Sequence, residues 1–180
     1  MAWLDAPISG GAPAALEGRM AVMVGGEQAD YDRAKPLWNA LAARATLMGG
    51  QGAGQSTKMI NQVLVACTFA MLGEACALAQ RAGVEAMKIP QALAGGRADS
   101  RLLQEFLPKM AKPDFTVEGR IGLMLKDLEM VHDLAKATGS VMPVTALVTE
   151  ITRQLVLRGL GDADNSAIVT LYQEGAPKAG

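Results

Sequence analysis

Short apolar runs that end in glycine pairs characterise the first 50 residues of the chain. Three such runs lie at 1–11, 19–26 and 45–50, and the segment 27–43 has apolar positions at helical spacing. Apolar runs of about four to eight residues bounded by turn residues predict strands, whereas repeats at i, i+3 and i+4 predict an amphipathic helix. The pattern therefore predicts the order strand, strand, helix, strand, with glycine-rich turns.

Helical periodicity dominates from residue 54 onward. An almost uninterrupted apolar segment at 55–82 predicts one long helix that Gly83 ends. We expect further helices wherever apolar positions repeat at helical spacing between glycine, proline or capping residues. They lie at 85–94, at 100–110 with Ser100 as N-cap, at 120–138 up to Gly139, at 143–159, and at 166–175 with Asp164 or Asn165 near the cap.

The chain is therefore predicted to have a mainly α fold in two parts. Three strands and one helix are too few to form a stable domain by themselves. We expect residues 1–50 to be the end of a larger domain and residues 51–180 to form an all-helical domain.

The composition narrows the class of protein. Half of the residues are hydrophobic and 19% are charged, which is ordinary for a soluble protein with a real core. Aromatic residues make up only 4% while methionine occurs 11 times, so we expect an aliphatic core with methionine filling the gaps. The net charge is −1 and the basic residues are scattered, which argues against a nucleic-acid partner.

Two cysteines, Cys67 and Cys76, fall inside the long apolar segment. In one helix they would lie on opposite faces about 13 Å apart, too far for a disulfide, so we interpret them as small buried apolar residues. The sequence has no Cys/His spacing typical of a metal site and no signal peptide at its N-terminus. Charged and polar residues interrupt the long apolar run, which predicts a buried helix rather than a membrane span. We therefore expect a reduced, cytoplasmic protein.

A polar stripe stands at the start of the predicted long helix. Lys58, Asn61 and Gln62 have the i, i+3, i+4 spacing that places side chains on one helix face. A solvent-exposed helix start explains such a stripe equally simply. The glycine-rich segment 49–54 just before it instead suggests a site, because glycines allow close backbone approach to a ligand and a helix N-terminus favours an anion.

Two further segments are candidates for chemistry. Ser9-Gly10-Gly11 follows a predicted strand and offers a hydroxyl and unhindered N–H groups suited to a carboxylate, although a tight turn is the simpler explanation. Lys126 and Asp127 lie in an apolar helix, where an exposed ion pair is the alternative. The single histidine, His132, lies in the same helix, and we do not expect it to be catalytic.

Together these segments resemble one family. The motifs D-A-P-x-S-G-G, G-x-G-x-x-x-K-x-x-N-Q and K-D-L occur in the order found in the β-hydroxyacid dehydrogenases, the 3-hydroxyisobutyrate dehydrogenase-like family. The resemblance extends from about Leu4 to Tyr172. K-M-I-N-Q and G-L-G-D-A-D-N-S-A are most similar to the tartronate semialdehyde reductase (2-hydroxy-3-oxopropionate reductase) branch.

The resemblance implies an NAD(P)-dependent oxidoreductase that interconverts a short β-hydroxyacid and its semialdehyde, such as tartronate semialdehyde with glycerate, or 3-hydroxyisobutyrate. It implies a helical domain of the 6-phosphogluconate dehydrogenase-like type preceded by the last strands of a Rossmann-type domain. Lys58 would be the catalytic acid/base, and Lys126 would contact the cofactor. The implied substrate-binding residues are Ser9, Gly10 and Gly11 for the carboxylate, with Asn61, Gln62 and Asp127 around the substrate.

Two departures from the family pattern matter. The G-x-G-x-x-G fingerprint of a Rossmann domain is absent, so the chain resembles the C-terminal part of a dehydrogenase in which most of the cofactor domain is missing. Gly119 also stands where many relatives have a phenylalanine that lines the active site. The pocket is then either larger or filled by a neighbouring side chain.

Alternative functions stay open at this point. The chain could be a noncatalytic dehydrogenase-like module used for oligomerisation, or an inactive half of an enzyme that folds and dimerises. Retention of Lys58, Asn61 and Ser9 argues against loss of the catalytic function. The long helix is apolar on nearly all sides and must be covered on all of them, so we expect a homodimer or higher oligomer.

Overall fold

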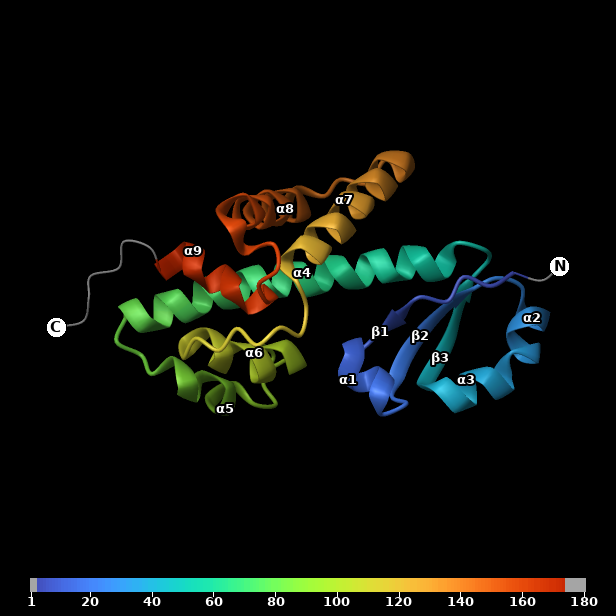
Figure 1. The fold of residues 1–180 in the computed structure, drawn as a ribbon, viewed down its shortest axis with the longest axis horizontal. Helices are drawn as coiled ribbons and strands as arrows, with labels where there is room; N and C mark the ends of the chain where they lie inside the picture. Colours follow the sequence, from blue (N-terminus) through green and yellow to red (C-terminus); the bar gives the residue numbers. More distant parts are fainter. Residues whose placement is uncertain (1–2, 174–180) are drawn as a thin grey trace.

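A computed structural model of the protein describes residues 3–173. One long helix, α4 (Ala53–Arg81), runs through most of the molecule and connects its two parts (Figure 1). A small sheet with three short helices lies at the N-terminal end of α4, and the remaining helices pack along the middle and the C-terminal part of α4. The predicted mainly α fold, with strands confined to the first 50 residues, is confirmed.

The sheet has three strands in the order β1 (Ile8–Ser9), β2 (Met20–Gly25) and β3 (Ala42–Gly49). β1 is antiparallel to β2, and β2 is parallel to β3. Val22 and Val24 of the central strand are buried, whereas β1 is short and its Ile8 is exposed. The three predicted strands are therefore present, although most of the first apolar run is not in a strand.

Two details of the predicted order for this region were wrong. A helix that the apolar pattern did not indicate, α1 (Gly11–Leu16), lies between β1 and β2. The helix predicted at 27–43 is two helices, α2 (Gln28–Arg33) and α3 (Lys35–Leu41). Proline in the first turn of α3 has no backbone N–H, and it therefore favours a new helix start over continuation of α2.

Three of the predicted helices form at the expected positions. The structure confirms α4, α6 (Arg101–Ala111) and α7 (Ile121–Thr138). The Ser100 hydroxyl accepts a hydrogen bond from the Leu103 N–H at 3.0 Å and caps α6. Gly139 ends α7 in the left-handed conformation, with φ of 69°.

The other predicted helices are divided into shorter elements. The segment 85–94 forms η1 (Ala86–Lys88) and α5 (Ile89–Leu93), because Pro90 begins a new turn. The segment 143–159 forms α8 (Pro143–Leu155) and the π-helical η2 (Val156–Leu160), with Gly159 at φ of 84°. The last predicted helix forms η3 (Asn165–Val169) and α9 (Thr170–Gln173), and its final residues, 174–175, lie outside the described part.

The core lies where α6, α7, α8 and η3 pack on α4. It is aliphatic with methionine, as predicted, and one aromatic pair contributes: Phe69 and Phe106 meet edge to face with ring centroids 4.8 Å apart. Cys76 is buried in this core and Cys67 is half-buried, and both thiols are free. Burial raises the pKa of the Cys76 thiol.

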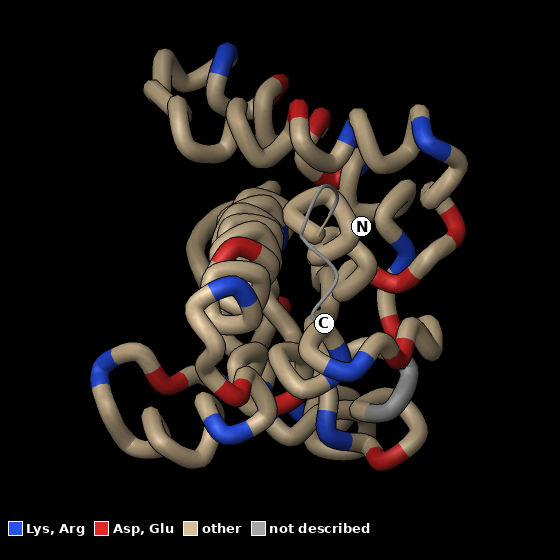
Figure 2. Tube along the Cα trace, turned by 90° about the vertical axis from the view of Figure 1, so that its left-hand side faces the viewer, with Lys and Arg blue, Asp and Glu red and all other residues tan. Residues whose placement is uncertain are grey.

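Positions of Lys and Arg are interspersed with positions of Asp and Glu along the trace, and neither sign is confined to one side of the molecule in this view (Figure 2). α4 has the length and apolar composition that a membrane span also has, but the core helix of a soluble protein has the same properties. Its packing against helical elements such as α6, α7, α8 and η3 explains the apolar residues that it buries.

Candidate active site

A cavity of about 410 Å³ opens where the sheet end and α1 face α6 and α7, with α4 as its floor. Seven of the eight residues predicted for the site line this cavity although they come from three separate parts of the sequence. They are Ser9, Gly10, Gly11, Lys58, Asn61, Gln62 and Asp127. The structure thus brings the predicted residues together, while their individual roles stay predictions.

The Ser9-Gly10-Gly11 turn forms one wall of the cavity. It connects β1 to α1, and Gly10 and Gly11 have φ of 120° and 64°, which side-chain-bearing residues rarely adopt. A Cβ on Gly10 would lie 2.5 Å from the Cβ of Ala14. Glycine at this turn is therefore required by the backbone conformation.

A carboxylate clamp fixes the start of α4 to the sheet. The Asp5 side chain accepts hydrogen bonds from the Gly52 N–H at 2.7 Å and the Gln55 N–H at 2.8 Å. Burial opposes ionisation, but these N–H donors hold the pKa of the Asp5 carboxyl below its ordinary value. A Cβ on Gly54 would lie 2.5 Å from the Met23 carbonyl oxygen, so glycine permits this close approach. Lys58, one turn further along α4, is thereby positioned opposite the Ser9 turn.

A chain of polar contacts crosses the cavity from β1 to α7. The Ser9 hydroxyl lies 3.5 Å from Asn61 Oδ1, and Asn61 Nδ2 donates to Gln62 Oε1 at 2.8 Å. Gln62 Nε2 in turn donates to Asp127 Oδ2 at 2.6 Å. The chain fixes the two amide side chains, and it leaves the cation of Lys58 beside them.

Lys58 is half-buried in the cavity wall. Burial lowers the pKa of its ammonium group, and the charge of Asp127 partly counters this effect. Among residues 3–173, the Lys58 ammonium has no hydrogen-bond or ion-pair partner. A half-buried cation with a lowered pKa and free donors suits the donation of a proton to a bound oxygen.

The wall opposite the Ser9 turn depends on Asp164, which is fully buried. Its carboxylate accepts N–H groups of Glu118 at 2.8 Å and Gly119 at 3.1 Å, and it also accepts from the Ser166 N–H and hydroxyl. Burial opposes ionisation, but these donors keep the pKa of Asp164 low. Asp164 thus fixes the loop before α7 to η3.

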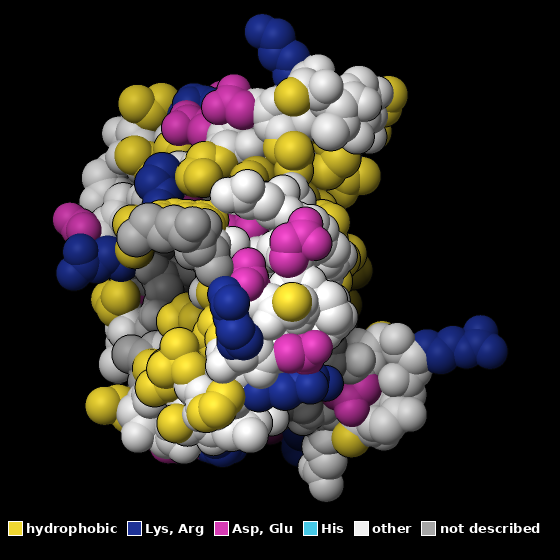
Figure 3. Space-filling model, turned by 90° about the vertical axis from the view of Figure 1, so that its right-hand side faces the viewer, with side chains coloured by type: hydrophobic (Ala, Val, Ile, Leu, Met, Phe, Trp, Pro, Cys, Tyr) yellow, Lys and Arg dark blue, Asp and Glu magenta, His cyan; other side chains and the backbone are white. Residues whose placement is uncertain are grey.

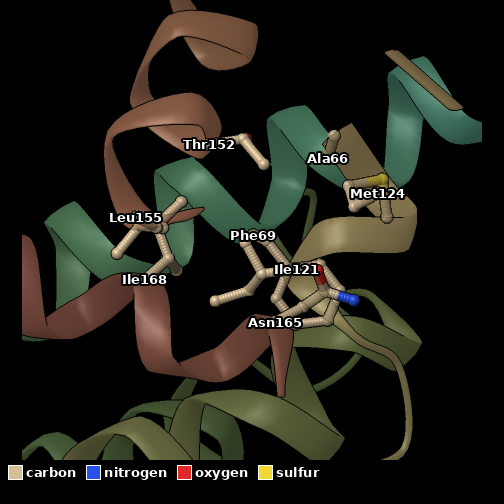
Figure 4. Close-up of a pocket in the computed structure, with 8 residues that line it drawn as sticks. All are labelled: Ala66, Phe69, Ile121, Met124, Thr152, Leu155, Asn165 and Ile168. Carbon is tan, nitrogen blue, oxygen red and sulfur yellow. The ribbon is translucent and has the colours of Figure 1, made fainter. Parts of the chain in front are cut away.

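Asn165 occupies the space next to Gly119. A Cβ on Gly119 would lie 2.8 Å from Asn165 Nδ2, so a neighbouring side chain partly fills the position. Asn165, Phe69 and Met124 line both the main cavity and a small void of about 10 Å³ behind it (Figure 4). From the sequence, Asn165 was predicted only to lie near a helix cap, because no local pattern indicates its contact with residue 119.

Comparison with known protein families identifies the class of protein. The family description "NAD-binding of NADP-dependent 3-hydroxyisobutyrate dehydrogenase" matches residues 52–172, and "NAD binding domain of 6-phosphogluconate dehydrogenase" matches residues 1–50. The chain belongs to the 3-hydroxyisobutyrate dehydrogenase-like β-hydroxyacid dehydrogenase family.

Individual members of this family resemble the chain over nearly its whole length. The 2-hydroxy-3-oxopropionate reductase of Escherichia coli is 40% identical over 167 residues, which are 93% of this chain and 57% of the relative. An L-threonate dehydrogenase of Cupriavidus necator is 31% identical over 94% of this chain and 57% of its own length. The chain thus spans less than two thirds of the length of these β-hydroxyacid dehydrogenases.

Solved structures of family members show the same fold. The 3-hydroxyisobutyrate dehydrogenase of Salmonella typhimurium superposes with a TM-score of 0.85 at 31% identity, covering 94% of this chain and 60% of that one. The corresponding enzyme of Mycobacterium tuberculosis, solved with L-serine, gives a TM-score of 0.84 at 28% identity, covering 93% of this chain and 60% of that one.

The cofactor of this β-hydroxyacid dehydrogenase family is NAD or NADP. Lys126, the residue predicted to contact it, does not line the cavity. Its ammonium lies 3.3 Å from Asp127 Oδ1, and its side chain is 62% exposed. Lys126 is thus an exposed cation at the edge of the cavity, next to Asp127. This position is compatible with a polar contact to a cofactor bound at the cavity mouth.

The single histidine, His132, fits a structural role. His132 lies in α7, and its Nε2 is 2.8 Å from the Thr149 hydroxyl of α8, so the ring connects two helices outside the cavity. Within residues 3–173, no three His, Cys, Asp or Glu side chains are close enough to hold a metal ion.

Proposed function

We propose that the enzyme that contains this chain interconverts a short β-hydroxyacid and its semialdehyde with NAD or NADP. Tartronate semialdehyde with glycerate, and 3-hydroxyisobutyrate with its semialdehyde, are the candidate pairs. The observation that supports this most strongly is that Lys58 shares one cavity with the Ser9-Gly10-Gly11 turn. A cation with a lowered pKa and a turn suited to a carboxylate together match an acid that is reduced or oxidised at its β-carbon, C3.

In this proposal the residues of the chain bind the acid and move the proton. The N–H groups and hydroxyl of the Ser9-Gly10-Gly11 turn hold the carboxylate, and Asn61 holds the reacting oxygen. NADH or NADPH, when bound, supplies the hydride for the carbonyl carbon, and Lys126 is the residue of this chain that contacts it. Lys58 donates its proton to the oxygen as negative charge develops there. In the opposite direction Lys58 must be neutral, and its burial favours the neutral form.

The relatives support a small substrate. The Escherichia coli relative is named for a three-carbon hydroxy-oxo acid, and the Mycobacterium tuberculosis relative was solved with L-serine, which is also a three-carbon acid with a β-hydroxyl group. The same reaction class is therefore proposed for this chain, with the substrate bound between α4, α7 and the Ser9 turn.

We further propose that residues 1–50 are the last part of a dinucleotide-binding domain and that residues 51–180 form the substrate and dimerisation domain. Only Lys126 of this chain is assigned to the cofactor, and one exposed lysine is insufficient to hold a dinucleotide. The 180-residue chain alone is then inactive, and a cytoplasmic location follows from the soluble cofactor and substrate.

An assembly role accompanies the catalytic one. Four apolar side chains on α4 are largely exposed: Ile60 by 58%, Leu64 by 66%, Met71 by 59% and Leu78 by 70%. Their spacing of four, seven and seven residues places them along one helix face. Figure 2, seen nearly along α4, shows one side of that helix without a covering segment. In Figure 3 hydrophobic side chains also gather below the uppermost segment, which is the end of α7 in Figure 1. We assign the face of α4 that carries Ile60, Leu64, Met71 and Leu78 to contact with a second copy of the chain.

The reaction is tested with a fusion enzyme in which the part of the Escherichia coli relative that precedes the region matched by this chain is joined to the N-terminus of the chain. We expect oxidation of NADH or NADPH with tartronate semialdehyde or methylmalonate semialdehyde, the oxidised form of 3-hydroxyisobutyrate. A Ser9→Ala, Asn61→Ala variant should raise the KM for the semialdehyde. A folded fusion enzyme that binds the cofactor but reduces neither semialdehyde would contradict the proposed function.

A further inference from the structure

The Asn165 side chain faces the substrate cavity without a partner. It lines the same cavity as Lys58 and Ser9 but comes from the far wall, at the start of η3. Within the described part of the chain, its side-chain amide makes no hydrogen bond. Figure 4 shows the side chain extending from η3 toward Ile121 and Met124 of α7. An amide in this position has both a donor and an acceptor available for a ligand.

The backbone around Asn165 is built to hold it in place. The Asn165 N–H donates to the Gly119 carbonyl oxygen at 2.9 Å, and Asp164 fixes the N–H of Gly119 from the other side. Because a Cβ at position 119 would lie 2.8 Å from Asn165 Nδ2, the amide occupies space that only glycine leaves open. The two positions therefore form one unit, which we call the Gly119–Asn165 pair.

The charged groups of the far side and mouth of the cavity are already paired. Arg101 bonds Glu105 at 2.7 Å, Lys109 bonds Glu118, and Arg120 lies 3.5 Å from Asp162. The amide of Gln62 is likewise bonded to Asp127, and α6 contributes the apolar side chains Leu102 and Phe106. The Asn165 amide is thus the polar group of this wall that is available to a neutral part of the substrate.

We propose that Asn165 binds a hydroxyl group on C2 of the substrate, so that the enzyme prefers a 2,3-dihydroxy acid and its 2-hydroxy-3-oxo form over a 2-alkyl acid. This inference rests on the proposed function. With the carboxylate on the Ser9 turn and the C3 oxygen at Lys58, two sides of the cavity are taken, and the C2 substituent faces the third. A hydroxyl there bonds the amide, whereas a methyl group of similar size would leave the amide unpaired.

The two probe acids differ only in this substituent. Glycerate carries a hydroxyl at C2 and 3-hydroxyisobutyrate carries a methyl group there. Dissociation constants of both enantiomers of each acid would be measured on the fusion enzyme by saturation-transfer NMR, with NADH or NADPH present so that neither acid is oxidised. We expect the better enantiomer of glycerate to bind at least about fivefold more tightly than the better enantiomer of 3-hydroxyisobutyrate, the effect of about one hydrogen bond.

Two variants change the amide by independent routes. Asn165→Leu removes it at similar volume, and Gly119→Ala displaces it with a single methyl group. Each should bring the ratio of the two dissociation constants close to one, and the double variant should resemble the singles because both act on one contact. Asn39→Leu, on exposed α3 outside the cavity, is the matched control and should leave the ratio unchanged.

The outcomes separate this inference from the proposed function. If both acids bind but the ratio is close to one in the unmodified fusion enzyme, or stays unchanged in both variants, the assignment of Asn165 is wrong while the proposed function stands. If neither acid binds at millimolar concentration, the proposed function fails and this inference fails with it. Thermal unfolding of each variant identifies a folding defect, in which case Gly119→Ala, the smaller change, decides.

Discussion

The side-chain amide of Gln62 donates a hydrogen bond to Asp127 Oδ2 at 2.6 Å and so joins α4 to α7 inside the cavity. The contact orients Gln62, which in turn accepts from Asn61. The same carboxylate acts electrostatically on Lys58: burial lowers the pKa of Lys58, and Asp127 raises it. Asp127 therefore positions the amides and partly offsets the larger effect of burial on the pKa of Lys58.

Replacing Asp127 with Asn should move the pH profile of the fusion enzyme to lower pH. An amide at this position still accepts a hydrogen bond but no longer carries the charge that raises the pKa of Lys58. Reduction needs protonated Lys58 and is lost as pH rises through its pKa, so that loss should occur at lower pH. Oxidation needs neutral Lys58, so it should begin at lower pH. Initial rates in both directions measure this, with the exposed Asp133→Asn of α7 as control, and an unmoved profile would remove Asp127 from the tuning of Lys58.

Asp5→Ala should destabilise the fold by about 0.5–2 kcal/mol at neutral pH, the range for loss of a side chain that accepts N–H groups at a helix start. The pKa of Asp5 is lowered in the folded state, so its stabilisation is present above the unfolded pKa of about 3.9 and disappears as pH falls through the folded pKa. Urea unfolding at pH 7 and near pH 3 measures both values. A variant as stable as the parent at pH 7, or a difference that persists unchanged in acid, would show that the clamp does not stabilise α4. The exposed Asp162→Ala should have little effect at either pH.

The 180-residue chain should not bind NADH or NADPH measurably. Lys126 is its only residue assigned to the cofactor, and that side chain is largely exposed. Isothermal titration calorimetry of the chain with each nucleotide tests this expectation. A micromolar dissociation constant would mean that the upstream nucleotide fold is less necessary than we propose.

The exposed apolar face of α4 should hold two copies of the chain together. Leu64→Glu places a charge in the middle of that face and should convert a dimer or higher oligomer into a monomer, because an unpaired buried charge is strongly unfavourable. Leu16→Glu, on the highly exposed α1, should leave the assembly intact. Light scattering at micromolar concentration compares them, and a stable monomer of the unmodified chain would exclude this role for α4.

Local patterns predicted the elements whose ends depend on neighbouring residues. Ser100 begins α6 and Gly139 ends α7, and each does so through residues only a few positions away in the sequence. Both helix ends were predicted correctly. The break between α2 and α3 near Ala34 was missed because the apolar residues keep their helical spacing across it. Pro36 prevents one continuous helix, since it has no backbone N–H.

In the candidate site, too, residues close together in the sequence were predicted and contacts between distant residues were not. The stripe of Lys58, Asn61 and Gln62 was visible because helix geometry alone places these side chains together. The clamp of Asp5 on Gly52 and Gln55, and the contact of Gly119 with Asn165, join residues more than 40 positions apart. No periodicity indicates such contacts, which depend on how the helices pack.

The assignment of Lys58 as proton donor is the central claim, and Lys58→Ala in the fusion enzyme tests it most directly. General acid–base catalysis contributes about 10²–10⁴-fold, so turnover in semialdehyde reduction should fall by at least about 100-fold while cofactor affinity and the unfolding temperature stay close to those of the parent. Lys58→Arg should not restore turnover, because the guanidinium pKa is too high for ready proton release and its planar shape does not match a point charge. Near-normal turnover of Lys58→Ala on tartronate semialdehyde or methylmalonate semialdehyde would contradict the assignment and leave Lys58 as a partly solvated residue at the start of α4.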